Sequence, residues 1–409
     1  MHFLPILSTL RRHRTAAALI VLEIAVTCAI VCNAIFLIGD RLSRMDRQSG
    51  VAEDELVRVQ IAGIGKTSDG YAVTTQDMVA LRAIPGVKSV ATTNMVPFGG
   101  SSWNTDVSRI ADDPDRPINV GFFLGTHDLV ETLGVQITAG RDFTAEEYIR
   151  WDDYKGDDTK GVKIGSVIIT QGIADRLFPG ESPLGKPLYV TGKDPQTIVG
   201  VVDRIARPNE FNGSKYGAFA VFLPVVTPYN VGGNYLLRVD ADRKDEVLAA
   251  VDRAFDSVDP NRIMLKRQTF AEIRADYFKQ DRAMAYLLIG VSIALLVITA
   301  LGIVGLASFW VQQRTRQIGI RRALGATKRD IVRYFQTENF ILATAGIVLG
   351  MALAYGINLW LMSKYEVPRL PATFLPVGAG LLWFLGQIAV LGPALRASTI
   401  PPAIATRSV

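Results

Sequence analysis

The sequence predicts an α-helical membrane bundle of four spans combined with an α/β (α+β) extracytoplasmic domain of two lobes. Three observations lead to this fold class: four apolar runs are long enough to cross a bilayer, one polar segment of about 240 residues separates the first two runs, and a basic loop follows the second run. With 49 % hydrophobic and 20 % charged residues and a mean hydropathy of +0.23, the chain is too apolar for a wholly soluble protein and too charged for a wholly membrane-embedded one.

The apolar and basic segments give the predicted order along the chain. Basic residues beside apolar runs tend to stay in the cytoplasm, which places the N-terminus and the loop after the second span there, and the long polar segment on the other side. We expect a cytoplasmic N-terminus at 1–14, spans at 15–38, 283–311, 335–362 and 373–394, an outer domain at 39–282, a cytoplasmic loop at 312–334, an outer loop at 363–372 and a cytoplasmic tail at 395–409.

The first apolar run is predicted to be an uncleaved anchor. It ends at Gly39, Asp40 and Arg41, whereas a cleaved signal peptide has a shorter apolar core and a small-residue cleavage site. Glu23 lies a little over two turns into the run. An intramembrane acid is a candidate functional residue, and snorkelling or pairing near the cytoplasmic face is the structural alternative. Both interpretations stay open.

The outer segment has a strand, helix, strand pattern at each end. The predicted elements are 56–61, 74–84 and 87–94 at one end, and 235–240, 242–258 and 263–267 at the other. Two such units predict one split α/β lobe made from about 51–94 and 231–268, with a second, β-rich lobe from about 95–230. This segment contains no cysteine, and Cys28 and Cys32, four residues apart in the first run, are predicted to be buried free thiols.

A long helix is predicted to lead from the outer domain into the second span. Thr269 and Glu272 form a capping-box pattern, and no proline occurs from there until well past Val311. An unbroken helix of about 43 residues would be ~65 Å long, which exceeds the thickness of a bilayer. We therefore expect a stalk outside the membrane, beside an extension of the first helix through Leu42 and Met45.

Glycines in the second and third spans predict close helix packing. Gly302 and Gly305 lie in the second span, and Gly346 and Gly350 form a GxxxG pattern in the third. Small residues let helix backbones approach each other in a membrane. For the GxxxG pattern, packing within the chain is favoured over a seam between two copies, and both remain open.

The basic loop carries a helix, a turn and a second helix start. A short helix is predicted from Gln312 to Leu324, followed by Gly325 after its C-cap. Thr327 and Asp330 then form a capping box that begins the third span. Lys328 and Arg329 follow in a first turn, where the helix dipole disfavours cations. Their charge therefore serves either membrane topology or contact with a partner.

The same loop resembles a known signature. Its sequence RTRQIGIRRALGA resembles the cytoplasmic signature R-x-x-E-I-G-I-R-K-A-L-G-A of permeases of the MacB and FtsX family, with Gln317 in place of the usual Glu and Arg322 in place of Lys. The outer phrases LGVQITAGRDFT, IADRLFPGESPLGKPL and TIVGVVDR are similar to the extracytoplasmic core domain of MacB-type permeases, which has a porter-like lobe and a β-rich lobe. The tail PALRASTIPPAIATRSV resembles the family's ending.

The resemblance implies a non-catalytic permease subunit of a MacB-like ABC transporter in a bacterial inner membrane. In such systems ATP and magnesium are bound by separate ABC ATPase subunits, two permease copies or homologous permeases form a dimer, and moving stalks do work across the membrane. Export of a drug, peptide or siderophore-like substrate is the expected function, with a periplasmic adaptor and outer-membrane channel as further possible partners. A lipoprotein-release permease and an FtsX-like signalling scaffold that controls a cell-wall hydrolase are the alternatives.

The residues expected to couple to the ATPase lie in the basic loop. We expect Ile318, Ile320 and Leu324 to supply apolar anchors, and Arg316, Arg321 and Arg322 to meet acidic groups of the partner. The full predicted set is Arg314, Arg316, Gln317, Ile318, Gly319, Ile320, Arg321, Arg322, Leu324, Gly325, Lys328 and Arg329.

The sequence lacks the motifs of ATP hydrolysis, nucleophilic catalysis and metal binding. It contains no Walker A sequence, no G-x-S-x-G or SxxK nucleophile motif, and only three histidines. We therefore predict no catalytic, cofactor or metal site on this chain and no nucleic-acid partner. The acidic residues between 146 and 158 are more typical of a solvated face than of a calcium loop.

Overall fold

The computed structural model describes residues 14–64, 69–111, 118–154, 162–190, 194–209, 217–365 and 369–401. Most of the predicted N-terminal segment and the predicted tail after Pro401 lie outside the described residues. The chain divides into two compact units, and each is described by itself. The membrane unit comprises Met1–Asp46 with Gln280–Val409, and the outer unit comprises Arg47–Lys279.

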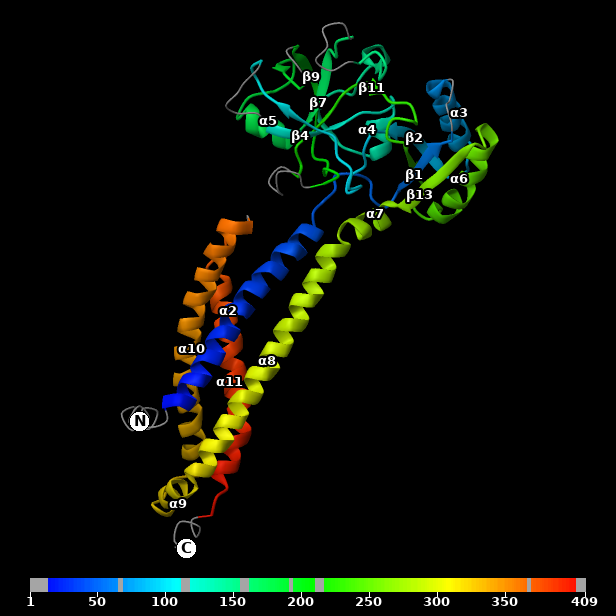
Figure 1. The fold of residues 1–409 in the computed structure, drawn as a ribbon. Coiled ribbons are helices and arrows are strands. Elements are labelled where there is room, and N and C mark those ends of the chain that lie inside the picture. Colours follow the sequence, from blue (N-terminus) through cyan, green and yellow to red (C-terminus); the bar gives the residue numbers. More distant parts are fainter. Residues whose placement is uncertain are drawn as a thin grey trace. The chain divides into compact units, whose positions relative to one another are not determined.

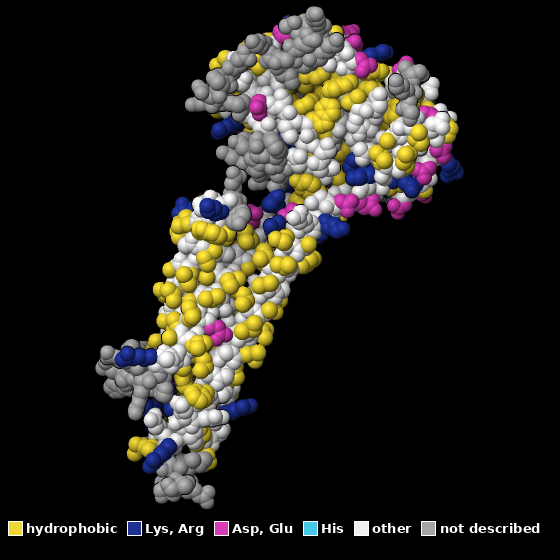
Figure 2. Space-filling view, viewed as in Figure 1, with side chains coloured by type: hydrophobic (Ala, Val, Ile, Leu, Met, Phe, Trp, Pro, Cys, Tyr) yellow, Lys and Arg dark blue, Asp and Glu magenta, His cyan; other side chains and the backbone are white. Residues whose placement is uncertain are grey.

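Four long apolar helices form the membrane unit (Figure 1). They are α2 (Arg14–Met45), α8 (Lys279–Gln313), α10 (Lys328–Tyr365) and α11 (Phe374–Ser398), and the short helix α9 (Thr315–Ala323) stands between α8 and α10. Each of the four is long and apolar enough to cross a membrane, which confirms the four-span prediction. Figure 2 shows hydrophobic side chains along the surface of these helices and Lys and Arg side chains gathered at their ends.

The core of the membrane unit forms where α2 packs against α10. A Cβ atom added at Gly350 would lie 2.5 Å from the Cβ atom of Cys28, and one added at Gly346 would lie 2.8 Å from the side chain of Ile24. Asn33 on α2 donates a hydrogen bond of 3.1 Å to the carbonyl of Ala354 on α10. The GxxxG pattern therefore serves packing within one chain, as favoured from the sequence. Both cysteines are buried free thiols, as predicted.

The predicted unbroken stalk helix is wrong. Thr269 and Glu272 do form the capping box, with the Thr269 backbone N–H donating to the Glu272 carboxylate at 2.8 Å. The helix that they start, α7 (Phe270–Tyr277), ends at Phe278, whose φ of −90° and ψ of 10° separate it from α8. Phe278 is fully buried and its ring lies 5.3 Å from the ring of Phe98. Tertiary packing of one aromatic side chain therefore interrupts a helix that has no proline.

The first lobe of the outer unit is a four-stranded antiparallel sheet covered by two helices. Its strand order is β13, β1, β12, β2, so that β12 from the end of the segment lies between β1 and β2 from its start. The elements are β1 (Leu56–Gly63), α3 (Gly70–Arg82), β2 (Val87–Thr93), β12 (Asn234–Val239), α6 (Lys244–Val258) and β13 (Arg262–Thr269). All six elements were predicted from the sequence, with bounds that differ from the observed ones by up to four residues, the largest difference being the start of α3.

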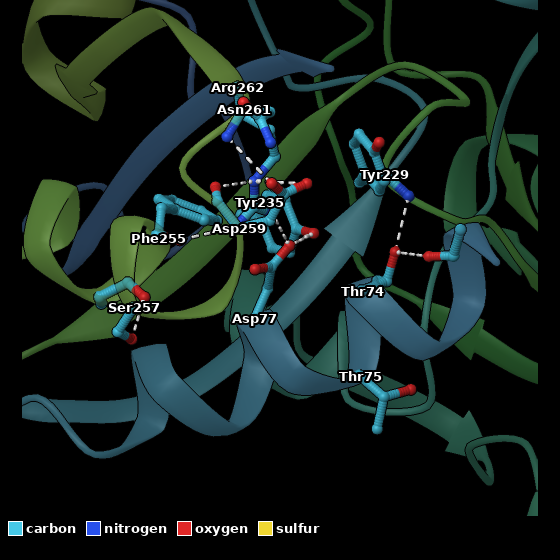
Figure 3. A network of polar contacts seen from close by, with 12 residues as sticks. Thr74, Thr75, Asp77, Tyr229, Tyr235, Phe255, Ser257, Asp259, Asn261 and Arg262 are labelled. Atoms are coloured by element: carbon cyan, nitrogen blue, oxygen red, sulfur yellow. Dashed lines mark hydrogen bonds and ion pairs between the residues drawn. The ribbon is translucent and has the colours of Figure 1, made fainter. Parts of the chain in front are cut away.

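A buried polar network ties this lobe together (Figure 3). The carboxylate of Asp77 on α3 accepts hydrogen bonds from the Tyr235 hydroxyl at 2.6 Å and from Arg262 at 2.5 Å. Arg262 also donates to the carbonyl of Phe255 near the end of α6 at 2.8 Å. Burial raises the pKa of the Asp77 carboxyl group, and the hydrogen bonds from Arg262 and Tyr235 oppose this shift. The network joins α3, β12, α6 and β13, and thus unites segments from the two ends of the outer unit.

The second lobe is β-rich, as predicted. Seven strands form one sheet in the order β3, β4, β10, β7, β9, β5, with β8 paired to β9, and β6 pairs with β11. The elements are β3 (Asn104–Val107), β4 (Ile118–Phe123), α4 (Leu129–Leu133), β5 (Ile137–Gly140), η1 (Ala145–Glu147), β6 (Ile149–Arg150), β7 (Ser166–Thr170), α5 (Gln171–Leu177), β8 (Pro187–Leu188), β9 (Gln196–Val202), β10 (Ala220–Phe222) and β11 (Val225–Val226). Gly180 and Gly185 have positive φ, which glycine adopts without steric cost, in the segment between α5 and β8.

Candidate functional site

The basic loop folds as a short helix between two membrane helices. α8 ends at Gln313 and α9 begins at Thr315, so that Arg314 alone separates them, with a φ of −105° and a ψ of 12°. The helix predicted from Gln312 to Leu324 is therefore interrupted near its start. α9 and the end of α11 lie at the same end of the membrane unit (Figure 1).

The turn after α9 has the predicted geometry. Gly325 adopts a φ of +100°, and its N–H donates to the carbonyl of Arg322 at 3.2 Å. Thr327 and Asp330 then form the predicted capping box: the Thr327 N–H donates to the Asp330 carboxylate at 3.0 Å, and the Asp330 N–H donates to the Thr327 hydroxyl at 3.2 Å. These contacts start α10 at Lys328, ahead of the predicted span at 335.

Arg314, a member of the predicted ATPase-coupling set, points into the membrane unit, and its part in coupling stays a prediction. It is only 6 % exposed. Its Nη1 atom donates to both carboxylate oxygens of Glu338 on α10, at 3.0 and 2.9 Å. Its guanidinium carbon lies 5.6 Å from the centre of the Trp310 ring. A buried arginine with a carboxylate partner and an aromatic neighbour is a fixed structural element rather than a free surface charge.

Sequence reasoning missed Glu338. Its side chain is almost fully buried, and Glu338 lines a small cavity together with apolar residues such as Phe335. An acidic residue within a predicted span indicates a buried partner, so the signal was present in the sequence. The pairing with Arg314, 24 positions away, was not, because it depends on how α9 folds back against α10.

Ile318 and Gly319 are also buried, which corrects the prediction that Ile318 is an apolar anchor for a partner. Ile318 is 4 % exposed and belongs to the same hydrophobic core as Ile331 and Phe335 of α10. The two other predicted anchors differ from it. Ile320 is 45 % exposed, and Leu324, at 83 %, is the most exposed large hydrophobic side chain among the described residues.

The predicted basic residues likewise differ in whether they face the membrane core or the solvent. Arg322 is half-buried, and its Nη1 atom donates to the carbonyl of Ser398 at the end of α11 at 2.6 Å. Arg321 is exposed, with its guanidinium carbon 4.7 Å from the centre of the Tyr334 ring. The exposed residues of the predicted set are Arg316, Gln317, Ile320, Arg321, Leu324, Gly325, Lys328 and Arg329.

This surface is suited to binding rather than to chemistry. It presents guanidinium, ammonium and aliphatic groups, which recognise an acidic and partly apolar partner. Within the described ranges, no group of three or more His, Cys, Asp or Glu side chains could hold a metal ion.

Four membrane helices, a two-lobed α/β domain between the first two, and a basic helix between the second and third define a class of membrane permease. Comparison with known families agrees with this class. Residues 15–255 match the MacB-like periplasmic core domain, and residues 289–402 match the FtsX-like permease C-terminal domain. The chain belongs to the MacB/FtsX-type family of ABC transporter permeases.

Individual relatives are distant. The uncharacterized ABC transporter permease YknZ of Bacillus subtilis is 23 % identical over 381 residues, which covers 88 % of this chain and 89 % of that protein. The macrolide export ATP-binding/permease protein MacB of Bdellovibrio bacteriovorus is 25 % identical, and the match covers 98 % of this chain but only 60 % of that protein. The crystal structure of the periplasmic region of MacB from Actinobacillus actinomycetemcomitans is 11 % identical with a TM-score of 0.32, covering 57 % of this chain and 97 % of that one.

Proposed function

We propose that this chain is the permease subunit of a MacB-like ABC transporter in a bacterial inner membrane, driven by separate ATPase subunits that bind the outward face of α9. The observation that supports this proposal most is the combination of exposed cations and exposed aliphatic residues on one short helix. Arg316, Ile320 and Arg321 of α9 and Leu324 at its C-cap are all exposed, and cations interleaved with aliphatic groups suit an acidic, partly apolar partner.

Charge at the start of α10 adds to this argument. Lys328 and Arg329 are exposed in the first helical turn, where they oppose the helix dipole. The positive-inside effect needs only a local excess of cations, and Arg316 and Arg321 already supply one. A partner with acidic groups explains the surplus.

The chain connectivity explains how binding at α9 would do work elsewhere. α2 ends at Met45 and α8 begins at Lys279, so both lead directly to the ends of the outer unit. The proposal is that ATP-driven displacement of α9 moves these helices and rearranges the outer unit, without passage of substrate through the bilayer. The proposed system contains a second permease copy and exports a drug, peptide or siderophore-like substrate. A periplasmic adaptor and an outer-membrane channel complete the path.

Charge reversal on the outward face tests this function. In the Arg316→Glu/Arg321→Glu variant, co-purification with the co-expressed ATPase subunit and substrate-stimulated ATP hydrolysis should fall together by at least tenfold. Because the lost contacts are electrostatic and exposed, part of the parent's binding should also weaken as salt rises. The control is Arg176→Glu/Arg253→Glu, which makes the same charge change at exposed positions of the outer unit. Unchanged association of the α9 variant across the salt series would disprove the proposal.

A further inference from the structure

Three residues at the N-cap, the middle and the last turn of α9 contact the other membrane helices. Arg314, Ile318 and Arg322 stand four residues apart, so they share one helix face. Arg314 contacts Glu338 of α10, Ile318 lies in the membrane core, and Arg322 binds the carbonyl of Ser398 at the end of α11. This inward face thus attaches α9 to two different membrane helices.

The ion pair is the most constrained of these attachments. The side chains of Arg314 and Glu338 are 8 % and 2 % exposed, and their atoms approach to 2.9 Å. Little solvent screens a pair at that depth, and separating its members would leave a charge buried without a partner. Relative motion of α9 and α10 is therefore strongly resisted at this contact.

Arg314 also occupies the joint between α8 and α9. As the only residue between the two helices, it would allow α9 to rotate against α8 with changes in few backbone angles. Its guanidinium group binds the carboxylate of Glu338 on α10 and lies over the ring of Trp310 on α8. Next to it, the Thr315 hydroxyl donates to carbonyls at the end of α8, those of Val311 at 3.1 Å and Gln312 at 2.8 Å. α9 is thus held to α10 by a buried ion pair, whereas its junction with α8 is held by hydrogen bonds to backbone carbonyls within one helical turn.

α10 in turn is packed tightly on α2. Gly346 and Gly350 bring its backbone against Ile24, Ala25 and Cys28 of α2. Interfaces with so little free space transmit displacement instead of absorbing it. α2 then continues to Met45, two positions before the first residue of the outer unit, Arg47.

From these contacts we infer that the inward face of α9 is a positioning face, in which the Arg314–Glu338 ion pair makes α9 and α10 move as one body and so directs motion into α2. This inference rests on the proposed function, because it assumes that an ATPase displaces α9. It divides one helix into an outward face that binds the partner and an inward face that passes the displacement on.

The test separates binding from transmission. The Arg314→Met/Glu338→Met variant replaces the buried pair by apolar side chains of similar length, which buried sites tolerate well. A fluorophore attached through Leu42→Cys, near the outer end of α2 and 51 % exposed, reports movement there. Labelling is selective because Cys28 and Cys32 are fully buried. The variant should co-purify with the ATPase subunit as well as the parent does, whereas its fluorescence response to ATP should fall at least fivefold.

The matched control changes the outward face of the same helix. Arg316→Met/Arg321→Met should lose both the ATPase subunit and the response, since it removes the binding charges. If this control still binds, the proposed function fails. If it behaves as expected but the Met/Met pair variant keeps the full response, or loses the ATPase subunit as well, the inference about positioning fails.

A second variant covers the case in which the double replacement does not fold. Arg322→Met removes the contact to Ser398 from a half-buried side chain and leaves the core intact. It should keep ATPase binding and lower the response about twofold. If Arg322→Met keeps the parent's full fluorescence response to ATP, transmission through the inward face is contradicted. Arg314→Lys keeps a cation opposite Glu338, so a fluorescence response larger than that of the Met/Met pair variant would support the ion pair specifically.

Discussion

The helices α2 and α8 both connect the membrane unit to the outer unit, yet they are packed very differently. Their most apolar 18-residue segments have similar mean hydropathies of 2.4 and 2.8, but 61 % of that segment is buried in α2 and only 17 % in α8. α2 is held by α10 and α11, whereas α8 exposes large side chains such as Tyr286, Ile298 and Leu301. Hydropathy thus identifies a membrane span without telling whether it belongs to the core of the bundle.

Glycine positions explain part of this difference. Gly346 and Gly350 of α10 allow close approach to α2, while a Cβ atom at Gly290 or Gly305 of α8 would meet no described atom within 4 Å. Of the two glycines predicted to permit close packing in α8, only Gly302 does so, opposite the carboxylate of Glu23. The same residue type therefore has a packing role in one helix and little constraint in the other.

The largest expected effect comes from filling the α2–α10 contact. In Gly350→Leu, the new side chain would meet Cys28 and the carbonyl of Ala25 at less than 3 Å, so we expect a loss of about 3 kcal/mol or more from overpacking. Gly305→Leu on α8 should change stability by less than ~1 kcal/mol, since space is free and leucine favours a helix. Thermal unfolding in detergent checks both. Equal loss in the two variants would remove the distinction between α2 and α8.

Proline substitutions compare the two connecting helices directly. Leu42 on α2 and Met284 on α8 are both largely exposed near the ends that adjoin the outer unit, so proline there acts mainly on the backbone and costs ~3 kcal/mol locally. If motion travels through α2, Leu42→Pro should abolish substrate-stimulated ATP hydrolysis, and Met284→Pro should reduce it by severalfold. ATPase assays at matched protein levels measure this. A larger defect from Met284→Pro would assign the main role to α8.

A smaller effect is expected where α2 and α8 touch. The hydroxyl groups of Thr27 and Thr299 lie 2.8 Å apart and are buried. Hydrogen bonds between membrane helices contribute about 0.6 kcal/mol on average, so Thr27→Val and Thr299→Val should each lower stability by roughly that amount. The double variant should lose little more than either single one. A double-mutant cycle with no coupling would show that this contact does not join the helices.

Predictions from local patterns succeeded where the causes are local. The capping boxes at Thr269 and Thr327, the turn at Gly325 and the strands and helices of the first lobe follow from residues within a few positions of one another. The helix break at Phe278 was missed because its cause is a contact with Phe98, 180 positions earlier. Helical propensity alone gave no reason for the chain to bend there.

The sequence by itself determined the four spans, the two-lobed outer domain, the short basic helix and the family. It did so because apolar length, alternating patterns and turn residues act over short distances and leave a direct trace in the chain. Tertiary structure alone decided which face of α9 is free and which of the two connecting helices lies in the core. Arg314 and Arg316 are the same residue type two positions apart, and only the rotation of α9 against α10 buries one and exposes the other.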